Sequence, residues 1–271
     1  MYKTISLTGS WCALNCTFCQ RKYLENMIHV TPSTAGRILH ELYEIGVRGL
    51  LLSGGFRPDA TLPIEPYVEV LREAKKKYGF VINAHLGLVT NKSLLGELRD
   101  IIDVVDYEFT LSKFIIKDVR RLHISPTKYV ESLELIVDAG LHIVPHVFAW
   151  HPKIDVESAM KELEVIKNLD IPEITLLIYI DNTYKAISDT ILAKSMQIIE
   201  LIRAKYDGKV YMGCMRPNWL KPFLDYLLVE KAIVDRIANP HHKVRSTSSK
   251  YSIYDACCSI PERFVELFKI R

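Results

Sequence analysis

Short runs of β-branched and other apolar residues alternate with longer amphipathic segments along most of this 271-residue chain. The runs predict strands at residues 3–7, 49–53, 80–86, 104–111, 141–148, 173–180, 209–214 and 232–238. The segments between them carry apolar residues three and four positions apart, which predicts helices at residues 34–45, 66–77, 126–139, 156–169 and 188–205. One strand with its helix takes about 30 residues, the length of a βαβ unit. The repetition therefore predicts an α/β fold with a parallel sheet.

About six to eight such units make a complete or nearly complete (β/α) barrel of the TIM type. An open, doubly wound sheet is the alternative, but the first strand is not followed by the glycine-rich phosphate turn of that fold. After about residue 239 the pattern lapses into a polar, serine-rich stretch that ends in a short helix. We therefore expect a barrel domain at residues 1–238 and a C-terminal extension at residues 239–271 that closes over the barrel mouth.

The composition argues against several classes of protein. The formal net charge is only +3 and no block of lysine and arginine stands out, so no nucleic-acid partner is expected. No apolar run approaches the roughly 18–20 residues of a membrane span, and the first residues lack the pattern of a signal peptide. We therefore expect a cytoplasmic protein. In that reducing compartment the six cysteines indicate metal ligands or catalytic thiols rather than disulfides.

Three of these cysteines, Cys12, Cys16 and Cys19, lie close together directly after the first predicted strand. The carboxyl ends of the strands form the active-site face of a (β/α) barrel. Three thiolates at C-x3-C-x2-C spacing can hold three irons of a cubane cluster and leave the fourth iron without a protein ligand. The alternatives are a zinc site, which lacks a second CxxC pair further along the chain, and three unrelated buried cysteines.

The motif C-x3-C-x-φ-C, with the aromatic Phe18 just before its last cysteine, closely resembles the signature of the radical S-adenosylmethionine (SAM) superfamily. The resemblance implies a 4Fe–4S cluster on Cys12, Cys16 and Cys19, whose open iron is chelated by the methionyl amine and carboxylate of SAM. It also implies that reduction of the cluster yields a 5′-deoxyadenosyl radical, which abstracts hydrogen from an unactivated C–H bond. Phe18 would pack against the adenine.

A second match follows the second predicted strand, which ends in Ser53, Gly54 and Gly55. The superfamily usually carries G-G-E or G-G-D there, so the resemblance places these three residues beside the methionine part of SAM. Glycine lets a backbone approach a ligand without a steric clash. Phe56 stands in place of the family's acid, and a simple strand-end turn is the structural alternative.

Three further thiols remain outside the first motif. Cys214 ends the seventh predicted strand, and Cys257 and Cys258 are neighbours in the C-terminal extension. Three thiolates are enough to anchor a second, auxiliary iron–sulfur cluster, which we interpret as a further 4Fe–4S cluster. The alternatives are a buried Cys214 that packs as a small hydrophobic residue beside an accidental pair, and a redox or persulfide role.

Other stretches resemble the sulfur-inserting members of the superfamily. Arg216, in the sequence MRP, lies where biotin synthase carries an arginine that helps to hold its second cluster, and residues 104–140 resemble the fourth strand and helix of that family. Residues 245–251 loosely resemble the R-S-S-Y motif of lipoyl synthases. The N-terminal cysteine triplet of ordinary lipoyl synthases is missing, so the chain is most similar to a component of the split, two-protein lipoyl synthases of archaea.

Polar residues also occur inside predicted strands, where burial without a hydrogen bond costs about 1–3 kcal/mol each. Asn83 and His85 alternate onto one face of the third strand, and His146 lies in the fifth. By resemblance to the superfamily, Glu108 and Ser112 contact the ribose hydroxyls. A bound SAM molecule would supply partners for all five side chains, whereas the alternative for the histidines is a hydrogen-bonded structural role.

These features together predict a radical SAM enzyme of sulfur insertion. The sulfur would come from a sacrificial auxiliary cluster held by Cys214, Cys257 and Cys258, with Arg216 nearby. The resemblance implies an octanoyl-lysyl group on a lipoyl-carrier protein as substrate, and a second radical SAM lipoyl synthase component and a reducing electron donor as partners. The alternatives are a biotin synthase-like or other radical SAM enzyme that acts on a small free substrate, and a non-catalytic iron–sulfur scaffold.

Overall fold

The structure is a computed structural model that describes residues 1–246 and 251–270 of the chain. Within these ranges it contains one parallel sheet of nine strands, in the spatial order β2-β1-β3-β4-β5-β6-β7-β8-β9. The strands are β1 (Tyr2–Ser6), β2 (Ile28–His29), β3 (Gly49–Ser53), β4 (Val81–Ala84), β5 (Val104–Glu108), β6 (Ile143–Trp150), β7 (Glu173–Ile178), β8 (Lys209–Met212) and β9 (Arg236–Ile237). The predicted α/β fold with a parallel sheet is confirmed.

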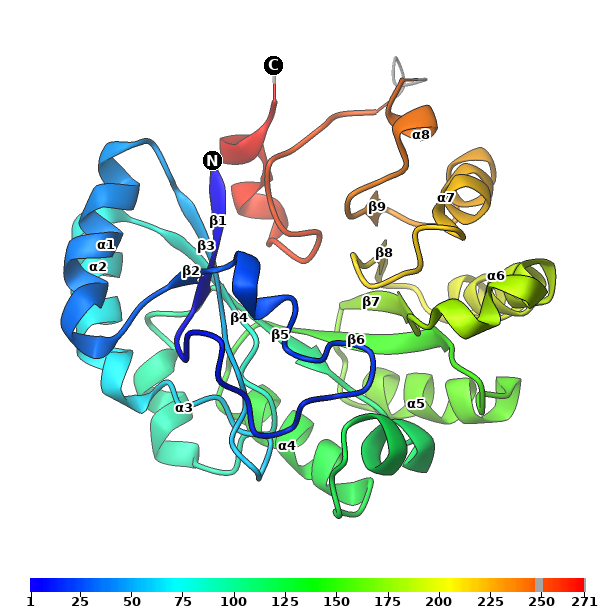
Figure 1. Cartoon of the computed structure of the whole chain (residues 1–271), viewed down its shortest axis with the longest axis horizontal. Helices are drawn as coiled ribbons and strands as arrows, with labels where there is room; N and C mark the ends of the chain where they lie inside the picture. Colours follow the sequence, from blue (N-terminus) through cyan, green and yellow to red (C-terminus); the bar gives the residue numbers. More distant parts are fainter. Residues whose placement is uncertain (247–250, 271) are drawn as a thin grey trace.

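Helices alternate with the strands and cover the outer face of the sheet, which curves around a central space (Figure 1). The helices are α1 (Pro32–Glu44), α2 (Val68–Tyr78), α3 (Lys92–Leu98), α4 (Thr127–Asp138), α5 (Val156–Asn168), α6 (Ser188–Lys205), α7 (Lys221–Glu230) and α8 (His242–Ser246). Short 3₁₀ helices cover Leu24–Asn26, Glu65–Tyr67, Asn182–Ile187 and Glu262–Phe268, and a π-helical segment covers Phe114–Val119.

The two faces of the sheet bury different sets of apolar residues. Leu50 of β3 packs with Leu39 of α1 in the large core between the sheet and its helices. The adjacent Val104 and Val105 of β5 show the alternation, because Val105 belongs to that outer core while Val104 belongs to a separate cluster inside the curved sheet. Successive side chains of a strand point to opposite faces. The interior of the curve is therefore lined by every second residue of each strand.

Local sequence signals fix where the helices begin and end. The hydroxyl of Thr31 and that of Thr34 form a capping box at the start of α1, and Pro32 takes the first helical position. The carboxylate of Asp155 accepts a hydrogen bond from the N–H of Ser158 at the start of α5. No helix among the described residues is long and apolar enough to cross a membrane.

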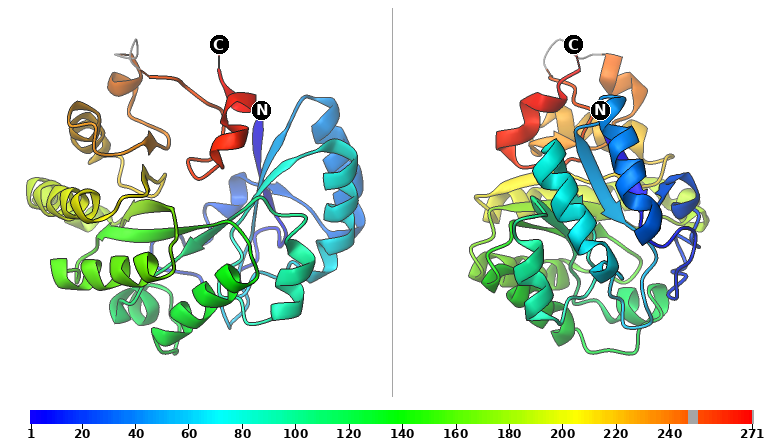
Figure 2. Two further views of the ribbon diagram at one scale, coloured as in Figure 1. Left: turned by 180° about the vertical axis from the view of Figure 1, so that it is seen from behind. Right: turned by 90° about the vertical axis from the view of Figure 1, so that its left-hand side faces the viewer.

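The C-terminal extension lies at the amino-terminal ends of the strands. The carboxylate of Asp255 accepts a hydrogen bond from the N–H of Tyr2, which begins β1. Arg236, which begins β9, donates hydrogen bonds to two backbone carbonyls of the extension. The ring of Phe268 lies against Gly49, which begins β3, where a Cβ atom would stand 2.7 Å from the ring. Figure 2 (right) shows this red segment opposite the dark blue loop that follows β1.

The prediction that the extension closes over the barrel mouth is therefore wrong. The sheet ends in two edge strands, β2 and β9, and the extension lies between the two ends of the sheet (Figure 1). Its apolar residues Ile260, Val265 and Phe268 are buried in one cluster with Val81, the first residue of β4. Burial of these side chains at the amino ends of the strands explains the position. The domain boundary at residue 238 stays a prediction.

Candidate active site

The three early cysteines lie in the irregular loop at the carboxyl end of β1, as the sequence predicts. Cys12 and Cys16 are buried, Cys19 is half-buried, and all three thiols are free. The N–H of Phe56 donates to Sγ of Cys12 over 3.4 Å. The guanidinium of Arg120 donates to Sγ of Cys16 over 3.5 Å. Both contacts place an N–H donor beside a cysteine sulfur of the loop.

The turn after β3 packs directly against the cysteine loop. A Cβ atom on Gly55 would stand 1.6 Å from the carbonyl oxygen of Trp11 and 2.5 Å from Cα of Cys12, so only glycine fits. The N–H of Gly55 donates to the hydroxyl of Thr8 over 2.5 Å. The structure thus gives this glycine a reason that the sequence does not reveal: it lets the turn touch the cysteine loop.

A half-buried ion pair connects β5 to the cysteine loop. Arg120 forms an ion pair with Glu108, the last residue of β5, and its Nε donates to Oε1 of Glu108 over 2.6 Å. The guanidinium carbon of Arg120 lies 5.2 Å above the ring centre of Phe18. The predicted site residues Phe18 and Glu108 are thereby brought together, with Arg120 between Glu108 and Cys16. Glu108 is engaged by an arginine in this structure.

Ser112 follows β5 and is held within its own loop. Its hydroxyl accepts a hydrogen bond from the N–H of Ile115, and its N–H donates to the hydroxyl of Thr110. Glu162 of α5 accepts from the hydroxyl of Thr110 over 2.9 Å and from the N–H of Leu111 over 2.7 Å. Burial raises the pKa of Glu162 to about 7 against the opposing effect of these donors.

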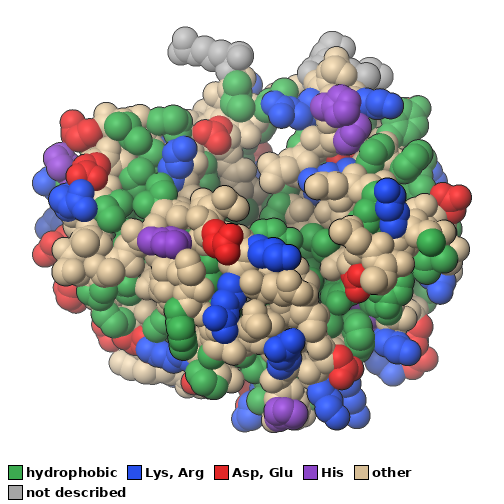
Figure 3. All heavy atoms as spheres, viewed as in Figure 1, with side chains coloured by type: hydrophobic (Ala, Val, Ile, Leu, Met, Phe, Trp, Pro, Cys, Tyr) green, Lys and Arg blue, Asp and Glu red, His purple; other side chains and the backbone are tan. Residues whose placement is uncertain are grey.

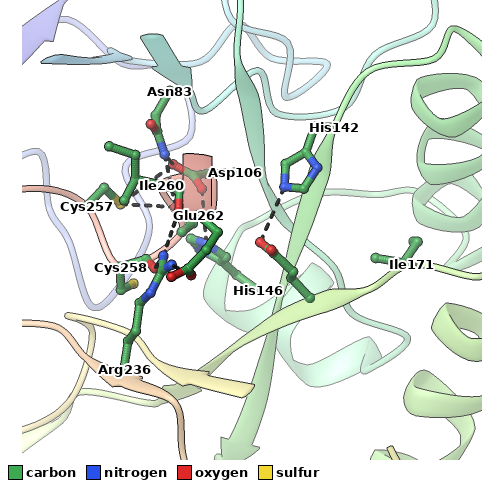
Figure 4. A network of polar contacts seen from close by, with 12 residues as sticks. Asn83, Asp106, His142, His146, Ile171, Arg236, Cys257, Cys258, Ile260 and Glu262 are labelled. Atoms are coloured by element: carbon green, nitrogen blue, oxygen red, sulfur yellow. Dashed lines mark hydrogen bonds and ion pairs between the residues drawn. The ribbon is translucent and has the colours of Figure 1, made fainter. Parts of the chain in front are cut away.

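Inside the barrel, the other predicted polar residues surround a carboxylate that the sequence reading did not single out. The side chain of Asp106 on β5 is fully buried. Asn83 donates to its Oδ2 over 3.1 Å, Nε2 of His85 lies 3.7 Å from that oxygen, and Nε2 of His146 lies 3.5 Å from Oδ1. The hydroxyl of Ser53 lies 3.3 Å from Nδ1 of His85. Figure 4 shows Asn83 and His146 pointing toward Asp106.

The charges in this network are set by burial. Burial lowers the pKa of His85 to about 4, although Asp106 acts in the opposite direction, so the imidazole is neutral at pH 7. Burial raises the pKa of Asp106, but His146, His85 and Ser259 together outweigh it and lower the pKa overall. The centre of the barrel therefore carries a buried negative charge.

The two cysteines of the extension reach this same centre from the amino end. Sγ of Cys257 lies 3.9 Å from Oδ2 of Asp106 and 3.1 Å from the hydroxyl of Ser259. A hydrogen bond with Cys257, together with burial, raises the pKa of the Cys258 thiol well above its usual range. Cys258 also packs against Val104, as a small hydrophobic residue would.

Cys214 follows β8 and interacts electrostatically with both thiols of the extension. Solvent reaches its side chain, so it is not the buried hydrophobic residue of the alternative interpretation. It is nevertheless enclosed enough that burial, followed by the nearby Cys257, raises the pKa of its thiol. Three cysteines from two distant segments of the chain thus interact electrostatically.

Arg216 has a different surrounding from these cysteines. It is fully buried, and its Nε and Nη2 donate to the two carboxylate oxygens of Asp225 on α7 over 2.8 and 3.0 Å. Further hydrogen bonds run to the backbone carbonyls of Gly213 and Ala238. These contacts fix the turn that carries Cys214. Arg216 therefore influences the position of this cysteine through the backbone and does not contact the late cysteines itself.

The donor sets suit iron–sulfur clusters better than a single metal ion. Among the described residues, no three cysteine, histidine or acidic side chains converge tightly enough to hold one ion. Each cysteine of a cubane binds a different iron, so the thiols stand further apart than around one ion. Both sets consist of three free thiols on loops or at strand ends, and cysteine thiolates are the usual protein ligands of such clusters. Residues 247–250 of the predicted R-S-S-Y-like stretch lie outside the described residues.

Two surface hollows lie apart from these cysteines. The larger, of about 730 Å³, is an open apolar groove between α6 and α7 on the outside of the barrel, lined by residues that include Leu192, Met196 and Leu227. The smaller, of about 230 Å³, lies beside α3. The face seen in Figure 3 is hollowed in its upper half, between the N-terminal strands and the part that carries α7 and α8. The cysteines and the Asp106 network make the interior the better candidate site.

A family model described as the Radical SAM superfamily matches residues 6–216, which is most of the chain and runs from the last residue of β1 to just beyond β8. This chain belongs to the radical SAM superfamily. Radical SAM enzymes use a 4Fe–4S cluster together with SAM, which agrees with the position of the early cysteines. Comparison with curated protein sequences gives no match.

Solved structures of other radical SAM proteins share the fold. SuiB from Streptococcus suis is 14% identical, with a TM-score of 0.60, over 83% of this chain and 51% of SuiB. Methylornithine synthase (PylB) is 15% identical, with a TM-score of 0.58, over 88% of this chain and 71% of PylB. The FeFe-hydrogenase maturase HydG is 13% identical, with a TM-score of 0.58, over 87% of this chain and 55% of HydG. The chain thus spans about half the length of SuiB and HydG.

Sequence reasoning missed three side chains of this radical SAM site: Asp106, Arg120 and Tyr179. The hydroxyl of Tyr179 lies 3.3 Å from that of Thr17, and its ring packs edge-on against Phe18. For Asp106 a signal exists, because an acid within the apolar strand VVDYE is unusual in a buried position. Arg120 and Tyr179 carry no such signal, since only the fold brings them to the cysteine loop.

Proposed function

We propose that this radical SAM protein is a sulfur-insertion enzyme with two iron–sulfur clusters. Cys12, Cys16 and Cys19 hold the 4Fe–4S cluster that, with SAM bound, supplies the hydrogen-abstracting radical. Phe18, the Ser53–Gly55 turn and the polar side chains at the carboxyl ends of β4 to β6 bind SAM. The second cluster is held by Cys214, Cys257 and Cys258.

The observation that carries this proposal is the meeting of the three late cysteines. Cys257 and Cys258 are hydrogen-bonded neighbours, and both interact with Cys214 although more than forty positions separate them in the sequence. They lie inside the same barrel whose carboxyl end carries the first cysteine loop. A second cluster at this place would stand within the barrel that also binds SAM, where a substrate radical can reach its sulfide.

The substrate class and partners follow from the same proposal. We propose an octanoyl-lysyl group on a lipoyl-carrier protein as substrate, a second radical SAM lipoyl synthase component as partner, and a reducing electron donor. A long aliphatic chain has unactivated C–H bonds of the kind that this radical chemistry attacks. A small free substrate, as in biotin formation, is the competing assignment within the same chemistry.

The first test counts iron in anaerobically reconstituted protein. Two cubanes give about eight irons per chain, and we expect about four in the triple variant C214A/C257A/C258A. The same triple variant should still release 5′-deoxyadenosine from SAM under reducing conditions. An unchanged iron content of about four in both proteins would remove the second cluster and with it sulfur insertion.

The second test addresses the substrate. The reconstituted enzyme, with SAM, reductant and the partner synthase component, is given an octanoyl-lysyl peptide, and mass spectrometry follows the addition of sulfur. We expect sulfur in the peptide with the native chain and none with C214A/C257A/C258A. Release of 5′-deoxyadenosine without sulfur addition, in the presence of two clusters, would favour a small free substrate instead.

A further inference from the structure

Glu162 on α5 is a buried carboxyl group that neither set of cysteines contacts. Only 4% of the residue is exposed, and its surroundings are hydrogen-bond donors rather than charged groups. Its Oε1 accepts from the hydroxyl of Thr110 over 2.9 Å and from the N–H of Leu111 over 2.7 Å. A glutamate is rarely buried without a charged partner, so this position requires a reason.

Residues 110–120 form the irregular connection after β5, here called the 110–120 segment. The hydroxyl of Thr110 accepts from the N–H of Ser112 over 3.1 Å, and the hydroxyl of Ser112 accepts from the N–H of Ile115 over 3.4 Å. Ile115 belongs to the π-helical turn of this segment. Such turns are rare and occur frequently at functional sites. A chain of hydrogen bonds therefore runs from Glu162 into the π-helical turn.

The far end of the 110–120 segment holds the cysteine loop. The backbone carbonyl of Val119 accepts from the N–H of Thr17 over 3.1 Å. The guanidinium of Arg120 donates to Sγ of Cys16 and lies over the ring of Phe18. The loop that carries the superfamily motif therefore takes part of its position from the segment that Glu162 anchors.

Aromatic contacts join the middle of the segment to the same loop. The ring of Phe114 stacks on that of His151, with ring centres 5.6 Å apart, and meets Tyr179 edge-on at 6.0 Å. Tyr179 in turn meets Phe18 edge-on at 6.5 Å. The segment thus reaches the cysteine loop by three routes, and its start is fixed by Glu162.

We propose that Glu162 is a positioning residue that holds the 110–120 segment, and through it the cysteine loop, in the arrangement that binds SAM. The inference rests on membership of the radical SAM superfamily and does not require the proposed second cluster. Loss of the Glu162 contacts would release the start of the segment. Val119 and Arg120 would then no longer be fixed against Thr17 and Cys16.

The protonation state of Glu162 determines how firmly the segment is held. Burial raises the pKa of this carboxyl group to about 7. The neutral acid stays buried and keeps an acceptor oxygen, whereas the ionised form favours an opened segment in which water reaches the carboxylate. Because the ordinary pKa of 4.5 lies below the value in the closed structure, closure is fully favoured below about pH 4.5 and weakens as the pH rises through 7.

The other titratable groups around Glu162 differ from it in charge state or in position. His151, beside Phe114, is neutral at pH 7 because burial lowers its pKa to about 4. His146, the titratable residue of β6, faces Asp106 inside the barrel. Arg120 is paired with Glu108. The other charged side chains of the segment, and those of α6 as far as residue 200, are exposed: Lys113, Lys117, Asp118, Asp189, Lys194 and Glu200.

The test compares the native chain with E162Q, E162L and the control E164Q, whose position on the same helix is exposed. All four are full-length, anaerobically reconstituted proteins. Equilibrium dialysis gives the Kd of SAM at pH 6.0 and pH 8.5. Hydrogen–deuterium exchange, corrected for the intrinsic rate at each pH, measures the opening of residues 110–120. Comparison between proteins at one pH removes the titration of SAM itself.

We expect the native chain to match E162Q at pH 6.0, and at pH 8.5 to bind SAM several-fold more weakly than E162Q and to exchange faster over residues 110–120. The glutamine keeps an acceptor but does not ionise, so the segment stays closed at both pH values. E162L lacks the acceptor and should show fast exchange and weak SAM binding at both. E164Q should follow the native chain.

An equal pH dependence of SAM affinity in the native chain and in E162Q would overturn the inference, whatever the exchange shows, because Glu162 would then not position the cysteine loop. A difference in affinity without a difference in exchange would overturn it as well, since Glu162 would not act through the segment. If E162L does not fold, the comparison of the native chain with E162Q decides the question. None of these outcomes depends on the second cluster, which the iron content of C214A/C257A/C258A tests separately.

Discussion

At the scale of single residues, Arg120 has the most direct electrostatic effect on the cysteine loop. Its guanidinium donates to Sγ of Cys16 over 3.5 Å and is held there by Glu108. Hydrogen bonds and positive charge near a cluster sulfur stabilise the reduced, more negative state of the cluster. We therefore predict that R120Q lowers the midpoint potential of the first cluster, as measured by an EPR-monitored redox titration.

The adjacent Arg121 provides the control. It is exposed, so R121Q removes the same formal charge without touching Cys16. The expected potential of R121Q is that of the native chain, because solvent screens an exposed charge, and R120K should recover part of the difference. An equal potential in R120Q and R121Q would show that the hydrogen bond has no effect on the cluster.

Single residues were predictable from the sequence to different degrees. Cys12, Cys16 and Cys19 were found because their spacing is local and their chemistry is specific to metal binding. Arg120 was not, because its importance depends on which neighbours the fold supplies, and Asp106 was missed although an acid within the apolar strand VVDYE is a signal. Arg216 was assigned to the second cluster, but its guanidinium is bound to Asp225; a buried ion pair leaves no mark in a single sequence.

At the scale of secondary-structure elements, the contact between α5 and the loop after β5 depends on the protonation of the Glu162 carboxyl group. Burial raises the pKa of Glu162 from an ordinary value of 4.5 to about 7. A raised carboxyl pKa means that its contribution to stability is fully present below about pH 4.5 and is lost as the pH rises through 7. Each pKa unit corresponds to about 1.4 kcal/mol, so the ionised form weakens folding by on the order of 3 kcal/mol.

We predict that E162Q removes this pH dependence. The glutamine keeps an acceptor for the hydroxyl of Thr110 and the N–H of Leu111 but does not ionise. The difference in free energy of unfolding between E162Q and the native chain should therefore be more favourable to E162Q at pH 8.5 than at pH 5.5. Denaturant unfolding under anaerobic conditions measures it. E164Q on the exposed face of the same helix should show no such gain; an equal effect in both would contradict the prediction.

Elements with strong periodicity were predicted well, and short elements were not. The predicted helices correspond to α1, α2, α4, α5 and α6, whose apolar faces are long enough to read. Strand β2, with two residues, and α3, with seven, were missed because a periodic pattern does not develop over so few positions. The predicted strand at residues 232–238 shrinks to β9, Arg236–Ile237, since only these residues pair with β8.

At the scale of the whole molecule, the C-terminal extension both packs against the amino ends of the strands and carries two cysteines of the proposed second cluster. Seen from behind (Figure 2, left), it lies in front of the strands at their amino ends. The sequence predicted that the extension carries cluster ligands but placed it at the mouth, because a strand pattern does not reveal at which end a later segment docks. The extension runs from Cys257, beside Asp106 in the barrel, to Phe268, which lies against Gly49 at the start of β3. One segment therefore both stabilises the barrel and carries the late cysteines.

Phe268 is the anchor on which this coupling can be tested. Its ring is 3% exposed and packs edge-on against Tyr2, with ring centres 5.5 Å apart. Truncation of a buried phenylalanine to alanine costs about 3–5 kcal/mol. We predict that F268A lowers the free energy of unfolding by about 3 kcal/mol or more and reduces iron retention at the second site, because the same segment carries Cys257 and Cys258.

Leu267 gives a matched control, since it precedes Phe268 and is 64% exposed. L267A should leave the free energy of unfolding within about 0.5 kcal/mol of the native value, as is usual for surface substitutions. Denaturant unfolding and iron content are measured on both variants under the same anaerobic conditions. If F268A loses stability but keeps all of its iron, the extension is a structural plug whose docking does not position the late cysteines. If F268A matches L267A in both measurements, the extension does not close the amino end of the barrel.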